Sequence, residues 1–168
     1  ILQLDVRDVL CPKTATKQHG FDALAHGALA FLSLSALKFG PSGVVVVCRT
    51  NHGNADRMGC WVYMTLMQIG WSDVLQLEEG NIQFVIGWKG EDGKGPWCKR
   101  FRATHVVDDQ MVHLKSCKHM AGTSLQPGGL ILFGADRSND DAVTAVADFR
   151  TLSIHLGIDE RLFVAARQ

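Results

Sequence analysis

A cysteine followed directly by a proline, Cys11-Pro12, is the first feature of the sequence with an evident chemistry. A thiol reacts as its thiolate, and a helix N-terminus or a nearby cation lowers its pKa from the ordinary value of about 8.5. Pro12 is favourable at a first helical position, where its missing N–H costs nothing. Lys13, Lys17 and Arg7 add positive charge nearby. We therefore predict that Cys11 is a nucleophile supported by these residues.

The alternative is that Cys11 is one more core side chain, because unpaired cysteine is among the most buried residue types. The choice depends on where the first helix begins. A helix that starts at Pro12 places Cys11 at its N-cap, whereas a helix that starts near Asp22 leaves Cys11 on a loop.

Apolar spacing predicts the elements that would position this cysteine. Residues 2–7 alternate apolar and polar side chains, as a half-buried strand does. Apolar residues at helical spacing then predict a helix that Gly40 and Pro41 end. Further along, the pattern predicts a buried strand at 44–48, a helix at 55–69 and a hairpin within 73–89.

The second half of the chain repeats part of this pattern. Residues 127–158 align with 41–71: a proline-glycine turn, an apolar strand, an Asn/Asp cap, an amphipathic helix and a glycine. Residues 100–109 and 111–122 predict the preceding strand and helix, and 161–167 a last strand. A glycine-rich charged stretch lies between the halves. We therefore predict a module at 1–90, a linker at 91–96 and a degenerate second copy at 97–168.

The first half resembles the TusA/SirA-like sulfur carriers. Leu4-Asp5, a short gap and Cys11-Pro12 stand where that family has Leu-Asp and Cys-Pro-x-Pro, although Thr14 replaces the second proline. The resemblance implies an α/β fold, an α+β two-layer sandwich. Each βαβαββ module would have a mixed sheet with two helices on one face. It also implies a persulfide carried on Cys11, with Asp5 among the supporting residues, and protein partners that donate and accept sulfur.

A second hypothesis keeps the fold without the chemistry: a non-catalytic accessory subunit of a larger, possibly organellar, assembly. The sequence leaves open whether the chain is an enzyme beyond sulfur-transferase-like chemistry. A third reading, RNA binding through the basic stretch at 97–102, is weaker, since the formal net charge is zero and nucleic-acid binders usually carry a basic excess. Protein partners are therefore expected, and nucleic acid is not.

Composition limits the remaining classes. The five cysteines form no CxxC pair, and with the seven histidines they show no zinc spacing, so we predict no metal and no cofactor. An odd cysteine count favours an intracellular reducing compartment, cytoplasmic or mitochondrial. No apolar run reaches the roughly 18 residues of a membrane span.

Overall fold

The computed structural model describes residues 1–5, 8–11, 24–40, 42–49, 82–88, 93–122 and 124–158. The strands in this part of the chain are β1 (Leu2–Leu4), β2 (Val44–Arg49), β3 (Ile82–Trp88), β4 (His105–Asp108), β5 (Leu130–Phe133) and β6 (Thr144–Val146). The helices are α1 (Ala28–Phe39), α4 (Gly95–Phe101), α5 (Met111–Met120) and α6 (Phe149–His155).

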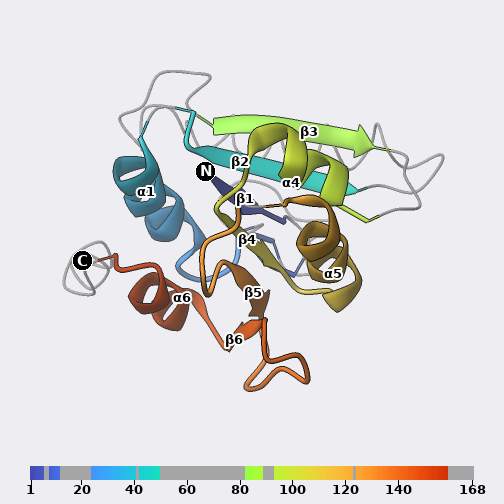
Figure 1. Cartoon of the computed structure of the whole chain (residues 1–168). Coiled ribbons are helices and arrows are strands. Elements are labelled where there is room, and N and C mark those ends of the chain that lie inside the picture. The colour runs from blue at the N-terminus through green and yellow to red at the C-terminus, as the bar shows by residue number, and fades with distance from the viewer. Residues whose placement is uncertain are drawn as a thin grey trace.

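The six strands form one sheet in the order β3-β2-β1-β4-β5-β6, and every pairing between them is parallel (Figure 1). The chain begins at β1, adds β2 and β3 on one side, and then returns to add β4, β5 and β6 on the other. The strand order therefore reverses between β1 and β4. In open parallel sheets, ligands bind at the carboxyl ends of the strands at such a reversal.

The described helices cover both faces of the sheet, which makes three layers. On one face, α1 and α6 bury Phe31 and Leu152 in a core cluster with Leu2 and Leu4 of β1. On the other face, α4 and α5 bury Cys98 and Leu114 against strands β4 and β5. A parallel sheet that is covered on both faces needs strands apolar on both sides, which the run of valines in β2 provides.

Local sequence explains where several elements begin and end. Gly40 follows α1 with a φ of 76°, a left-handed conformation that glycine adopts at little cost, and its N–H donates to the Ala36 carbonyl. Asp148 caps α6, because its carboxylate accepts a hydrogen bond from the Thr151 N–H at 2.8 Å.

The predicted α/β class is confirmed, as are the helix that ends at Gly40, the strand at 44–48 and the helix at 111–122. The strand predicted at 100–109 is shorter, because residues 95–101 form α4 and only His105–Asp108 form β4. The finer picture differs. Every described pairing is parallel rather than mixed, and helices lie on both faces. In the second half, α5 carries the chain back between β4 and β5. The sequence left open whether the two halves share a sheet, and they do.

Other predictions fall partly or wholly outside the described residues. Of the predicted hairpin, residues 82–88 form β3, which pairs in parallel with β2. The helix at 55–69 and the strand at 161–167 lie outside the described part. The division at 90 and 96 and the duplication stay predictions. Among the described helices, none is long and apolar enough to cross a membrane.

Candidate functional site

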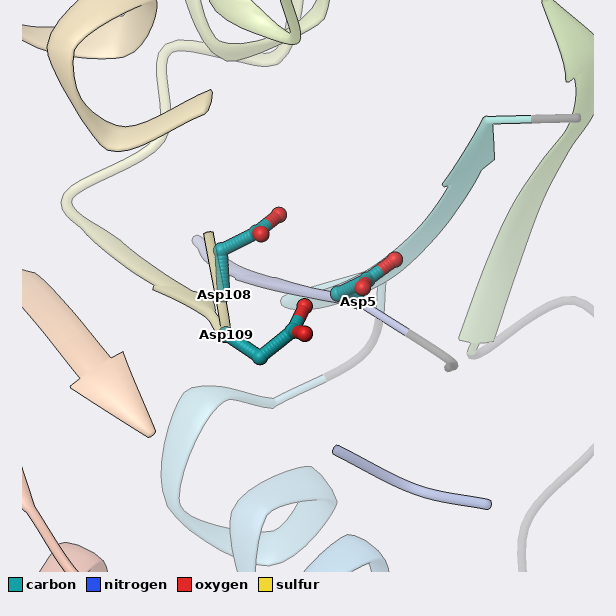
Figure 2. Close-up of side chains that lie close together, drawn as sticks. All are labelled: Asp5, Asp108 and Asp109. Atoms are coloured by element: carbon teal, nitrogen blue, oxygen red, sulfur yellow. The ribbon is translucent and has the colours of Figure 1, made fainter. Parts of the chain in front are cut away.

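Three carboxylates meet where the strand order reverses. Asp5 directly follows β1, Asp108 is the last residue of β4, and Asp109 comes next. Because β1 and β4 are parallel neighbours, their carboxyl ends lie at the same edge of the sheet. One oxygen from each carboxylate lies within 4.8 Å of the others. Figure 2 shows the three side chains. Like charges this close raise the pKa of one of the carboxyls unless a cation lies beside them.

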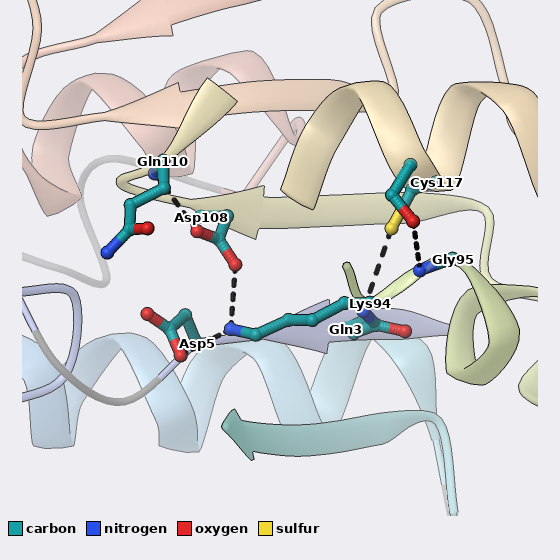
Figure 3. A network of polar contacts seen from close by, with 8 residues as sticks. Gln3, Asp5, Lys94, Gly95, Asp108, Gln110 and Cys117 are labelled. Atoms are coloured by element: carbon teal, nitrogen blue, oxygen red, sulfur yellow. Dashed lines mark hydrogen bonds and ion pairs between the residues drawn. The ribbon is translucent and has the colours of Figure 1, made fainter. Parts of the chain in front are cut away.

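Lys94 supplies positive charge to this cluster from the turn before α4. Its Nζ atom lies 2.5 Å from Oδ1 of Asp5 and 2.7 Å from Oδ2 of Asp108 (Figure 3). The lysine is only 2% exposed, so the ion pairs are shielded from water. Burial alone would lower the pKa of Lys94, but the two carboxylates outweigh it and hold that pKa above its ordinary value.

The glycines on either side of Lys94 let the turn approach α5 closely. A Cβ atom on Gly93 would lie 2.4 Å from the Cβ atom of Ser116, and one on Gly95 would lie 2.5 Å from the Ser116 carbonyl oxygen. The Gly95 N–H also donates to Ser116 Oγ at 2.9 Å. The sequence Gly-Lys-Gly therefore fixes the backbone from which Lys94 reaches the carboxylates.

Asp108 holds the lysine in place. One of its oxygens accepts from Lys94, and the other accepts from the Gln110 N–H at 3.0 Å. The residue is fully buried. Burial and the neighbouring Asp5 raise the pKa of Asp108 to about 7, although Lys94 and the Gln110 N–H act in the opposite direction. This carboxylate is therefore a positioning group rather than one that contacts a ligand.

Asp109 is the partly exposed member of the cluster. Its Oδ1 atom is buried and has no hydrogen-bond partner among the described residues. Burial and the nearby Asp5 raise the pKa of Asp109 to about 6. A buried carboxylate oxygen without a partner costs free energy, and a bound cation would remove that cost. The arrangement can thus bind a hard cation such as Mg²⁺ through carboxylate oxygens.

Of the predicted site residues, the structure places Asp5 in this cluster and Cys11 away from exposed surface. Cys11 is 2% exposed and belongs to the core cluster beneath α1. The first described helix begins at Ala28 rather than near the cysteine. Arg7, Pro12, Lys13 and Lys17 lie outside the described residues.

Sequence reasoning missed Lys94, Asp108 and Asp109. Lys94 lies in the stretch assigned to a linker, where its glycine neighbours indicated a loop and gave no sign of burial. A usable signal was present for the acids, because in each of the predicted strands at 2–7 and 100–109 an aspartate directly follows an apolar residue, Leu4 or Val107. The resemblance drew attention instead to the cysteine that follows the first of them.

Comparison with known proteins finds no matching family model and no matching curated protein. One solved structure is similar: D,D-heptose 1,7-bisphosphate phosphatase from Burkholderia thailandensis. It aligns with a TM-score of 0.52 over 94% of this chain and 98% of the phosphatase chain, at 16% sequence identity. This likeness concerns the fold.

The predicted membership of the TusA/SirA-like family is wrong, and so is the sulfur-relay function that it implied. The chain has the architecture of the phosphatase structure over nearly its whole length. The accessory-subunit alternative assumed the sulfur-carrier fold and falls with it. The Cys-Pro pair led to the wrong family because a strand followed by Cys-Pro is a short local pattern. Such a pattern does not determine the order of the strands in the sheet.

Proposed function

We propose that the protein is a Mg²⁺-dependent phosphatase that hydrolyses a small phosphate ester at the cluster of Asp5, Asp109 and Lys94. The observation that carries this proposal is that buried Lys94 forms ion pairs with both Asp5 and Asp108 where the strand order reverses. Phosphoryl transfer is catalysed mainly by positioning and by neutralising negative charge. The fold-level likeness to a phosphatase gives further support.

The residues present fit a magnesium ion. The buried, unpartnered Oδ1 atom of Asp109 faces the same cluster as Asp5, and both supply the carboxylate oxygens that Mg²⁺ prefers. Asp5 and Asp109 would hold the ion, with Asp108 behind them. When bound, the ion would neutralise negative charge on the phosphoryl oxygens.

Asp5 is the proposed nucleophile. Asp108 is fully buried and both its oxygens accept hydrogen bonds, whereas the Asp5 side chain is 9% exposed and its Oδ1 accepts from Lys94. In the first step, an Asp5 oxygen forms a bond to phosphorus while the bond from phosphorus to the ester oxygen breaks. That ester oxygen takes a proton from water and leaves as an alcohol. In the second step, water attacks phosphorus, the bond to Asp5 breaks, and inorganic phosphate is released. The proton that this water loses neutralises the hydroxide left by the first step.

Lys94 contributes charge throughout both steps. Its ammonium group lies within hydrogen-bond distance of Asp5 and is held there by Asp108, so it needs no reorganisation when negative charge accumulates. Its raised pKa keeps it protonated at neutral pH. The lysine is therefore a fixed cation beside the reacting group.

Hydrolysis of acetyl phosphate by the purified protein, with and without Mg²⁺, tests the proposal. We expect Mg²⁺-dependent release of phosphate, which Asp5→Asn lowers by about a thousandfold or more. Asp141→Asn, at an exposed carboxylate outside the cluster, is the matched control and should retain the activity. Titration calorimetry should show Mg²⁺ binding that Asp109→Asn weakens. Absence of both hydrolysis and Mg²⁺ binding in the wild-type protein would refute the proposal.

Localisation and partners are proposals that come from the sequence alone. We propose an intracellular reducing compartment, cytoplasmic or mitochondrial, because the cysteine count is odd and no spacing suggests a disulfide framework. The net charge of zero argues against nucleic acid as the main partner. A protein partner is compatible with a small-molecule substrate, and pull-down from each compartment would test both points.

A further inference from the structure

A cavity of about 280 Å³ lies at the same edge of the sheet as the acidic cluster. Phe133 ends β5, Ala147 and Asp148 follow β6, and Asp8 lies three residues after Asp5. All four line the cavity, together with Phe149 and His26 among others. Because all strands are parallel, the carboxyl ends of β1, β5 and β6 open on one side of the molecule.

The register of the sheet shows how close this cavity is to the cluster. Asp108 of β4 pairs with Leu132 of β5, so the next residues, Asp109 and Phe133, follow at the same level. Adjacent strands are about 4.8 Å apart. The cavity therefore adjoins the position proposed for the phosphoryl group.

The lining of the cavity combines aromatic rings with negative charge. The rings of Phe133 and Phe149 lie 4.7 Å apart between centroids, tilted by 44°. Asp8 and Asp148 carry carboxylates, and the described residues that line the cavity include no lysine or arginine, although the charge of Arg150 acts on Asp148 from the first turn of α6. Asp148 accepts from Thr151, but a carboxylate has about four acceptor positions and can accept further bonds.

We propose that this cavity binds the organic part of the substrate, and that this part carries an ammonium group. The inference rests on the proposed function, since the phosphoryl group would lie at Asp5 and Lys94. Aromatic faces attract ammonium groups through their quadrupole, and carboxylates attract them through charge. The same carboxylates repel a second phosphate. The substrate class is the phosphate monoester of a small amino alcohol.

The size of the cavity agrees with this class. Pockets for drug-sized ligands span about 300–1,000 Å³, so the cavity of about 280 Å³ accepts one compact group. A two-carbon linker between the ester oxygen and the nitrogen is of the order of one strand spacing, about 4.8 Å. That linker would carry the ammonium group from the cluster to the rings.

A pair of esters with the same shape and different charge tests the inference. Phosphocholine carries a quaternary ammonium group, and 3,3-dimethylbutyl phosphate replaces its nitrogen by carbon. We expect kcat/KM for phosphocholine to exceed that for the neutral ester by about tenfold. Asp148→Asn should lower this ratio about threefold, because asparagine still caps α6 but lacks the charge. Phe133→Leu should lower it as well, since leucine has no aromatic face.

Asp141→Asn is again the matched control, because Asp141 does not line the cavity, and its ratio should equal that of the wild-type protein. A ratio near one in a protein that hydrolyses acetyl phosphate would overturn the ammonium inference and leave the phosphatase proposal standing. If no ester is hydrolysed, a measurement of choline binding tests the ammonium inference. Thermal stabilisation by choline that Asp148→Asn reduces would support the inference, and the absence of stabilisation would overturn it.

Discussion

Replacing Lys94 by methionine tests the central claim about the site, which is that a buried cation balances two buried carboxylates. Methionine keeps an unbranched side chain and removes the charge. Asp5 and Asp108, whose side chains are 9% and 1% exposed, would then lack the cation to which both are bonded. Removing one partner of a buried ion pair costs about 3–5 kcal/mol. That is a large part of the roughly 5–15 kcal/mol by which domains are stable.

The loss should depend on pH in a defined direction. The pKa of Asp108 is already about 7 in the folded protein, and Lys94 acts to lower it, so the pKa rises further in the variant. An unfolded aspartate titrates near about 3.9. Because the folded variant then binds more protons than the unfolded chain, its stability falls as pH rises from about 4 through the raised pKa. The deficit relative to wild type is therefore larger at pH 8 than at pH 5.

Urea unfolding followed by circular dichroism at pH 5 and pH 8 measures this deficit. Lys99→Met is the control, because Lys99 is an exposed lysine of α4 and its loss should cost little. The double variant Lys94→Met/Asp108→Asn should recover part of the stability, since it removes one of the two uncompensated charges. If Lys94→Met does not fold at pH 8, the measurement at pH 5 still applies. A cost below about 1 kcal/mol at pH 8, as for an exposed pair, would refute the reasoning.

Three further predictions follow from individual side chains. Asp148→Ala should lower the free energy of unfolding by about 1 kcal/mol at pH 7 and Asp148→Asn by less, because only alanine removes the cap of α6. The Thr151 N–H holds the pKa of Asp148 below its ordinary value. The stabilisation by this cap is therefore present above the pKa of aspartate in the unfolded chain and is lost as pH falls through the pKa of Asp148 in the folded protein. Equal stabilities of the two variants in urea would contradict the prediction. Phe31→Ala should lower the free energy of unfolding by about 3–5 kcal/mol, because Phe31 is fully buried between α1 and the sheet and its ring centroid lies 5.0 Å from that of Phe149. Calorimetric unfolding measures this loss. A Tm close to that of the wild-type protein would contradict the prediction. Cys11 should react with iodoacetamide only as fast as local or global unfolding exposes it, because the residue is 2% exposed. Mass spectrometry with and without urea compares the labelling rates. Rapid labelling of the native protein would show that the thiol is accessible.

The sequence by itself determined the elements whose signals are local. Four consecutive β-branched valines predict a buried strand wherever it lies in the fold, and β2 begins at the first of them. Gly40 ends α1 because glycine adopts the left-handed conformation there at little cost. Period-two alternation located β1, and apolar residues at helical spacing located α1, so the α/β class followed without knowledge of contacts.

Tertiary structure alone decided how these elements are arranged and which residues form the site. Asp5 and Lys94 are 89 residues apart, and they meet only because β4 pairs with β1 and α4 packs against α5. Strand order depends on long-range pairing free energies, which no short stretch of sequence reveals. Burial of Lys94 is likewise a property of the assembled layers, since a lysine between two glycines has the local sequence of an exposed loop. Cys11 had the local sequence of a reactive thiol, and packing beneath α1 placed it in the core instead.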